Sequence, residues 1–168
     1  MKSLKEYIND IQSQAKSKYV AAIYDDETQQ KLREYCIKHG FDLTKSYSGE
    51  DQKPEDFEFH STIFYTKSTH IISNGIQQKE KMEVTPTEIT YLGEDYDIPV
   101  LKIKSDSLLW FRKHYEEEYN MEDYWDSYKP HISLSYNREI HPDPDKIPLP
   151  DFPLYFDKIK IDNGSEDV

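Results

Sequence analysis

The chain has 168 residues, enough for one domain with a sizeable core, and its 33 acidic and 21 basic side chains give a net charge of −12. This average charge repels a nucleic-acid duplex and favours a small ligand held by local basic side chains, or another protein, as the partner. The single cysteine excludes an intrachain disulfide framework and a cysteine-type zinc site, and no apolar run resembles a signal peptide or a membrane span, so we expect a cytosolic protein.

The first third of the chain predicts helix, strand and helix. Apolar residues recur at helical spacing over the first dozen positions, and residues 19–24 form a short apolar run typical of a buried strand. A second helix follows, with Asp25 or Asp26 as its cap and Gly40 at its end.

The middle of the chain predicts mainly strands. Residues 42–56 are polar and are expected to form a loop, and the polar stretch 67–81 contains Asn74-Gly75, a turn signal. Strands are predicted over 57–65, 83–92 and 98–104, the last two joined by a turn at 93–97.

The last third predicts helix, strand, loop and strand. Apolar spacing predicts a helix over 105–119, capped by Ser105 or Ser107, and residues 130–136 form a strand. The Pro-rich stretch 142–153 is a loop, and 152–161 is the final strand. This order predicts a single α+β domain over residues 1–168, with helices packed outside the sheet. Each half places a helix before a histidine-bearing strand, which hints at an internal repeat.

The histidine-bearing strands share a local repeat. His60-Ser-Thr62-Ile-Phe-Tyr65 and His131-Ile-Ser133-Leu-Ser-Tyr136 both read His, any residue, Ser or Thr, an apolar residue, any residue, Tyr. The other four histidines lack a hydroxyl residue two positions later, where Phe41, Ile72, Glu116 and Asp143 stand.

Alternation along a strand puts each histidine and its hydroxyl residue on one face. The opposite faces are expected to pack against the helices, and they carry Phe59, Ile63 and Tyr65 in the first strand and Ile132, Leu134 and Tyr136 in the second. Two such strands, side by side or facing, bring two imidazoles and two hydroxyls to one point.

This set of groups suits phosphodiester cleavage. A neutral imidazole can accept a proton from an attacking hydroxyl, and a protonated imidazole can donate one to the leaving oxygen. The hydroxyls of Thr62 and Ser133 can donate to the non-bridging phosphate oxygens. The reaction needs no metal ion or other cofactor, and the sequence shows no obvious metal cluster.

The two motifs resemble the paired signature of the two-histidine (2H) phosphoesterases. The resemblance implies two pseudo-symmetric lobes of antiparallel sheet with outer helices and a central cleft. The opening Met-Lys-Ser-Leu-Lys-Glu-Tyr-Ile, the Lys18-Tyr-Val-Ala strand and the Tyr128-Lys-Pro-His131 stretch further resemble the bacteriophage anti-CBASS nucleases. CBASS is a bacterial antiviral defence that signals with cyclic oligonucleotides.

The anti-CBASS resemblance implies cyclic di- and trinucleotides as substrates in the host bacterial cytosol, with His60 and His131 as acid and base. Thr62 and Ser133 would bind the phosphate, and the serine departs mildly from the threonine common in relatives. The resemblance also implies base contacts, for which Tyr19, Tyr91 and the C-terminal Glu166 are the candidates.

Three further features bear on function. The strand lysine pairs 102/104 and 158/160 each share a face, so either pair could offset the acidic average beside the site. The same chemistry also suits RNA ends with 2′,3′-cyclic phosphates or 2′-5′ oligoadenylates. A binding protein that sequesters a nucleotide without cleaving it is the alternative of another class. Base preference, ring size, linkage and oligomeric state are left open by the sequence.

Overall fold

The strands form one six-stranded antiparallel sheet with two α-helices. The computed structural model describes residues 4, 16–68, 75–119 and 128–162, and the sheet order is β2-β1-β6-β3-β4-β5. The elements are β1 (Lys16–Tyr24), α2 (Asp26–Lys38), the 3-10 turn η1 (Pro54–Asp56), β2 (His60–Ser68), β3 (Gly75–Leu92), β4 (Ile98–Lys104), α3 (Asp106–Tyr119), β5 (His131–Ser133), the 3-10 turn η2 (Pro144–Lys146) and β6 (Leu154–Asp162). The predicted α+β class is confirmed, while the helix predicted over the first dozen residues lies outside the described residues, Leu4 aside.

Both described helices begin at predicted caps. Asp25 Oδ1 accepts a hydrogen bond from the Thr28 backbone N–H at 2.8 Å, and Ser105 Oγ accepts one from the Leu108 N–H at 3.1 Å. After α2 the chain turns at Gly40, whose φ of +86° falls in the left-handed region. The buried face of α2 carries Thr28, Leu32, Tyr35 and Cys36 at helical spacing.

Strand β3 begins much earlier than predicted. Residues 75–81 were expected to belong to a polar turn region, but they pair with β6, Gly75 opposite Ile161 and Ile76 opposite Lys160. This part of β3 is largely exposed, so it carries no apolar alternation and is held by backbone pairing. The later part, from Thr85, pairs with β4, with an irregularity at Pro86.

The two motif strands differ from their predicted bounds: β2 begins and ends three residues later than predicted, and β5 is reduced to three residues. Residues 57–59 precede β2, because the Phe59 N–H donates to Gln29 Oε1 at 2.8 Å. Strand β5 ends at Ser133, and the hydroxyl of the buried Ser135 donates to the Asp42 carbonyl at 2.6 Å. At Phe59 a side chain thus takes the place of a strand as the partner of the backbone N–H, which an apolar pattern does not indicate.

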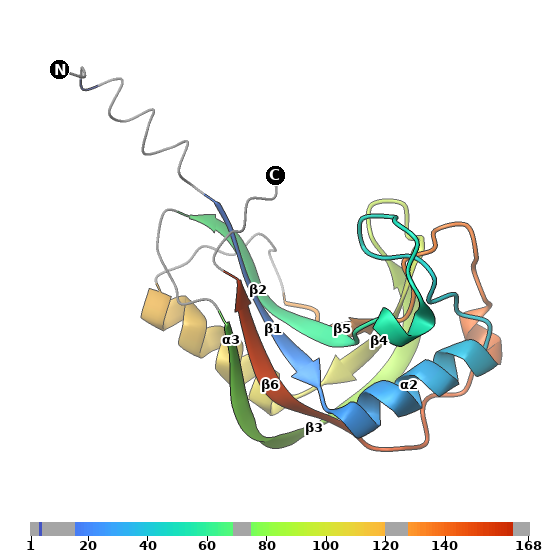
Figure 1. Ribbon diagram of the computed structural model, residues 1–168. Coiled ribbons are helices and arrows are strands. Elements are labelled where there is room, and N and C mark those ends of the chain that lie inside the picture. The colour runs from blue at the N-terminus through green and yellow to red at the C-terminus, as the bar shows by residue number, and fades with distance from the viewer. Residues whose placement is uncertain (1–3, 5–15, 69–74, 120–127, 163–168) are drawn as a thin grey trace.

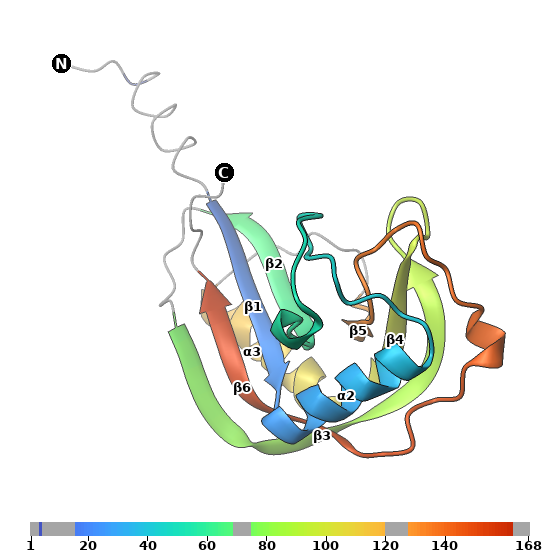
Figure 2. The same ribbon diagram turned by 45° about the vertical axis from the view of Figure 1, so that its right-hand side comes forward.

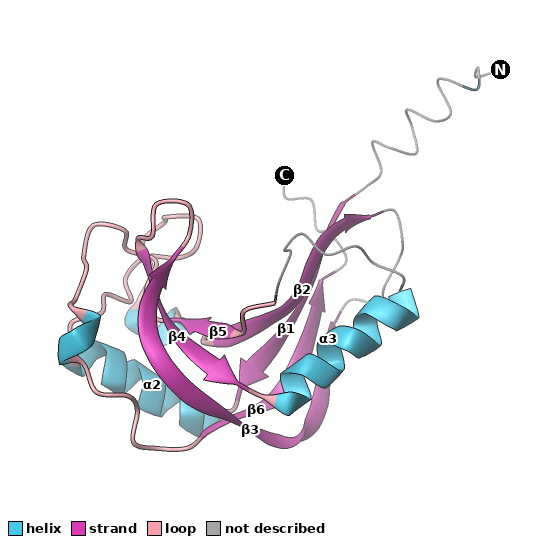
Figure 3. Cartoon of the chain, turned by 180° about the vertical axis from the view of Figure 1, so that it is seen from behind, coloured by secondary structure: helices cyan, strands magenta, loops and turns pink. Residues whose placement is uncertain are grey.

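The sheet bends along β3, which belongs to both of its halves (Figure 1). Strands β1, β2 and β6 rise on one side of the bend and β4 on the other, and Figure 2 shows the same arrangement after a 45° turn. From behind, α2 and α3 lie well apart on either side of the curved sheet (Figure 3). In the part of the chain that the structure describes, no helix is long and apolar enough to cross a membrane.

Candidate active site

The bend brings the two motif strands together. Strands β2 and β5 stand at opposite ends of the sheet order, yet they begin side by side (Figure 1). Ser61 Oγ donates to the His131 carbonyl oxygen at 2.9 Å, and Tyr128 Oη donates to the Thr62 carbonyl oxygen at 2.9 Å. The histidines that the sequence pairs by pattern are therefore neighbours in space.

Burial alternates along both motifs as predicted, up to the middle of β2. His60 and Thr62 are half-buried, while Ser61 and Ile63 are fully buried. In β5, His131 and Ser133 are half-buried on either side of the buried Ile132. Each histidine thus shares a face with its hydroxyl residue.

A β-bulge in β2 overturns the predicted position of Tyr65. Val20 of β1 pairs with Phe64 and Ala21 pairs with Thr62, so Ile63 is an extra residue without an opposite partner in this ladder. Beyond the bulge the alternation changes phase, and Tyr65 lies opposite Tyr19 on the histidine face. The prediction that Tyr65 packs behind the motif is wrong, because a bulge reverses the faces of all later residues.

Tyr136, predicted for the core behind β5, also reaches toward the site. Its ring stacks on Phe57 with centroids 5.4 Å apart, and its hydroxyl hydrogen-bonds the side chain of Ser133. Tyr47 meets the Tyr136 ring edge-on at 5.6 Å while its own side chain is 83% exposed. Tyr136 also packs against the hydrophobic core, so its predicted place behind β5 is confirmed in part. Its contact with Ser133 was not predicted, and neither was its contact with Tyr47, which lies in a loop without a motif.

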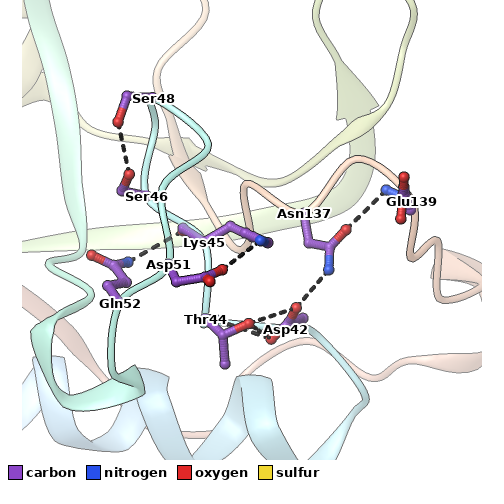
Figure 4. Close-up of polar contacts among 9 residues, drawn as sticks. All are labelled: Asp42, Thr44, Lys45, Ser46, Ser48, Asp51, Gln52, Asn137 and Glu139. Atoms are coloured by element: carbon purple, nitrogen blue, oxygen red, sulfur yellow. Dashed lines mark hydrogen bonds and ion pairs between the residues drawn. The ribbon is translucent and has the colours of Figure 1, made fainter.

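The loop that carries Tyr47 is tied to the segment after β5 (Figure 4). Asp42 accepts hydrogen bonds from Ser135 Oγ at its backbone oxygen and from Asn137 Nδ2 at its carboxylate, both at 2.6 Å. Within the loop, Lys45 pairs with Asp51 through both backbone bridge and side chains. The loop predicted over 42–56 is confirmed, with the 3-10 turn η1 at its end, and it is bonded to the segment that follows β5.

The two imidazoles have matching hydrogen bonds. Nδ1 of His60 lies 3.2 Å from the carbonyl oxygen of Glu58, and Nδ1 of His131 lies 2.7 Å from that of Lys129. A carbonyl only accepts, so in each neutral ring Nδ1 carries the proton and Nε2 has the free lone pair. Both rings are thus set to exchange protons through Nε2.

Burial lowers the pKa of both histidines below their ordinary value. Desolvation is the main cause in each, and the hydrogen bonds to the carbonyls of Glu58 and Lys129 offset part of it. The nearby Glu58 also raises the pKa of His60, whereas Lys160 and His131 lower it by charge repulsion. That the charge of His131 affects the pKa of His60 fits the closeness of the two motif segments.

Tyr19 lies beside the first motif. Its ring meets the His60 ring edge-on with centroids 6.2 Å apart, and its hydroxyl accepts a hydrogen bond from Thr62 Oγ1 at 3.4 Å. Burial raises the pKa of Tyr19 well above its ordinary value, so the phenol stays neutral. Its predicted role as a base contact stays a prediction.

Lysines lie on the same faces as both motifs. Strand β1 lies between β2 and β6, and its residue Ile23 pairs with His60 on one side and with Lys158 on the other. In the same way, Ala21 pairs with Thr62 and with Lys160. In the other half of the sheet, Lys102 pairs directly with His131, and its ammonium group lies 3.0 Å from a Glu88 carboxylate oxygen. The ammonium group of Lys158 lies 2.8 Å from an Asp157 carboxylate oxygen. Lysines therefore stand on the histidine faces of this acidic chain, and Lys158 and Lys102 are each paired with a carboxylate.

Comparison with known protein families identifies the family of this chain. Residues 16–164 match the family described as anti-CBASS protein Acb1. The chain belongs to the Acb1 family. The curated proteins compared with the chain include no match.

Membership of the Acb1 family makes this an anti-CBASS protein, which counters a bacterial antiviral defence. The match covers every described strand and both described α-helices. Both histidine motifs lie inside the matched range, so the site belongs to the part of the chain that defines the family.

Among the described residues of this Acb1-family chain, Tyr91 contacts residues away from the two histidines. Tyr91 donates from Oη to the Pro142 carbonyl at 2.6 Å and meets the His141 ring edge-on. Glu166 lies outside the described residues. Over the described ranges, 16–68, 75–119 and 128–162 with Leu4, the structure has no cluster of three or more His, Cys, Asp or Glu side chains arranged to hold a metal ion.

Proposed function

We propose that the protein is a metal-independent phosphodiesterase of the two-histidine type that cleaves the 3′-5′ bonds of cyclic di- and trinucleotide signals. One observation carries the proposal: on two neighbouring motif segments, each imidazole has Nδ1 hydrogen-bonded to a carbonyl and shares a face with a hydroxyl residue. Membership of the anti-CBASS family supports a cyclic oligonucleotide as the substrate, met in the host bacterial cytosol.

The reaction needs one proton acceptor and one proton donor. Nε2 of one histidine takes the proton of a ribose 2′-hydroxyl, whose oxygen then attacks the adjacent phosphorus. The bond from phosphorus to the 5′-oxygen breaks, and Nε2 of the other histidine protonates that leaving oxygen. The product is a linear nucleotide that ends in a 2′,3′-cyclic phosphate, and the two rings exchange protonation states.

The surrounding side chains support this chemistry. The hydroxyls of Thr62 and Ser133 lie on the histidine faces, where they would donate to the non-bridging oxygens. Lys158 and Lys160 stand on the same face and would attract the phosphates. Tyr19 would contact a base. The halves of the sheet on either side of the bend would correspond to the two pseudo-symmetric lobes, with the substrate in a central cleft.

Incubation of the protein with a panel of nucleotides tests the proposal. We expect cyclic di- or trinucleotides to be converted to linear products, with an unchanged rate after EDTA treatment, and chromatography to separate the products. Preferential cleavage of linear RNA ends or 2′-5′ oligoadenylates would redirect the proposal to another substrate. Recovery of intact bound ligand after denaturation would indicate a sequestering protein.

The pH dependence of cleavage should reflect the two histidines. Activity requires one neutral and one protonated imidazole, so kcat/KM peaks between the two apparent pKa values of the pair. Because burial lowers the pKa of both rings below about 6.5, the optimum for kcat/KM is expected below pH ~6.5. Above it, activity falls as the acid loses its proton. Initial rates at low substrate concentration measure the profile, and an optimum above pH ~7 would contradict the assignment.

A further inference from the structure

Two reciprocal hydrogen bonds join the motif segments behind the histidines. Ser61 of β2 donates from Oγ to the backbone oxygen of His131, and Tyr128, three residues before His131, donates from Oη to the backbone oxygen of Thr62, both at 2.9 Å. Each segment thus supplies one side-chain donor and one backbone acceptor. Because β2 and β5 are not neighbours in the sheet order, these bonds take the place of a strand ladder at this junction.

The Ser61 donor is fixed in direction. Its side chain is fully buried and its single hydroxyl proton goes to the His131 carbonyl, so the hydrogen bond of 2.8 Å between Ser61 Oγ and Tyr24 Oη must be donated by Tyr24. Tyr24 is itself fully buried. The buried Ser61 hydroxyl therefore accepts from Tyr24 and donates to the His131 carbonyl.

The Tyr128 ring is held by a buried cation. The Arg112 guanidinium lies 4.4 Å from the Tyr128 ring centroid, and Arg112 Nη1 donates to the Ile63 carbonyl at 2.8 Å. Arg112 Nε also lies 3.3 Å from a Glu116 carboxylate oxygen. The stacked side chains of Tyr128 and Arg112 thus donate to two consecutive carbonyls at the bulge of β2, those of Thr62 and Ile63.

The acceptors of the two bonds are the motif residues themselves. If the hydrogen bond from Ser61 to the His131 carbonyl lengthens, the backbone that carries the His131 imidazole moves. If the bond from Tyr128 to the Thr62 carbonyl lengthens, the backbone two residues after His60 moves. In-line cleavage needs both imidazoles at fixed places around one phosphorus, and a misplacement of about 1 Å can cost ~10²-fold in rate.

We propose that Ser61 and Tyr128 are positioning residues that fix the separation of the two motif segments, and with it the separation of the His60 and His131 imidazoles. The kinetic test of this inference rests on the proposed function, because kcat depends on the separation of the two imidazoles only if both act on one phosphate. Ser61 points to the buried face and so acts through His131.

Kinetic comparison of Ser61→Ala and Tyr128→Phe with matched variants tests the inference. Each is expected to lower kcat by ~10-fold or more with KM changed by less than about 2-fold, since alignment and not binding is lost. Tyr24→Phe removes the other hydrogen bond of Ser61 but leaves the one to His131. Tyr35→Phe removes a tyrosine hydrogen bond to the Pro148 carbonyl, 2.6 Å long, elsewhere in the fold. Both controls should lower Tm and leave kcat within about 2-fold of wild type, at a temperature well below every Tm.

A substrate-free measurement separates this inference from the proposed function. In NMR spectra of the histidine rings, Ser61→Ala and Tyr128→Phe should shift the signals of His60 and His131. The rings of His114 and His141 serve as internal references. Tyr35→Phe changes a ring that contacts His39, and it should leave the signals of His60, His131, His114 and His141 unchanged. Unshifted His60 and His131 signals, or kcat losses no larger than in the controls, would overturn the inference. A wild-type protein that cleaves no nucleotide would refute the proposed function, while the ring signals would still decide the positioning.

Discussion

Alanine at His60 or at His131 is expected to lower kcat for a cyclic dinucleotide by about 10³-fold, the typical contribution of a positioned acid or base. Each variant loses the only group that exchanges a proton at its side of the phosphorus in the proposed mechanism. Both side chains are half-buried and stand on a polar face, so circular dichroism should show an intact fold. Single-turnover cleavage followed by chromatography measures the loss.

A matched histidine variant completes this experiment. His114→Gln changes a half-buried ring whose partners lie on its own helix α3, Glu118 at 2.6 Å and the stacked Trp110, and should keep wild-type kcat. Retained activity in both His60→Ala and His131→Ala would refute the acid–base assignment. Unchanged ligand binding in these variants, with no cleavage by wild type, would favour sequestration.

Removing the motif hydroxyls should have the second-largest effect. Thr62→Val and Ser133→Ala are each expected to lower kcat by about 10²-fold, because each loses one donor to the charge that develops on the phosphate oxygens. The threonine variant keeps the branched shape of the side chain while losing its hydrogen bond to Tyr19 Oη. The measurement is kcat at saturating substrate, compared with KM for each variant.

Thr87→Val is the control for the loss of a strand hydroxyl. Thr87 on β3 donates from Oγ1 to the Lys102 carbonyl at 3.2 Å and is exposed, and its replacement should leave kcat unchanged. If Thr62→Val and Ser133→Ala raise only KM, the hydroxyls contribute equally to ground-state and transition-state binding. That result would contradict their proposed role in stabilising the transition state.

Local signals in the sequence predicted most elements but not the way the sheet closes. The cap at Asp25, the turn at Gly40 and the apolar strand 19–24 depend on a few neighbouring residues, and all three are confirmed. The early part of β3 was missed because it is exposed and held by β6. The approach of β2 to β5 depends on bonds spanning 66 and 70 residues, which no local pattern records.

The faces of the motif strands were predictable only as far as the backbone stays regular. Alternation placed His60 with Thr62 and His131 with Ser133 on half-buried faces, in agreement with the structure. Tyr65 was misplaced because the bulge at Ile63 adds one residue to β2. A bulge is a property of two paired strands, so the sequence of one strand alone does not indicate it.

The meeting of β2 and β5 has a consequence for how copies of this chain behave in concentrated solution. These are the two edge strands of the sheet, and an open edge invites a strand of another molecule to add to it, which is a common start of aggregation. Here the beginning of each edge strand is occupied by the other, through Ser61 and Tyr128. The same junction that brings the two motifs together therefore also shields the beginning of each edge strand from pairing with another molecule.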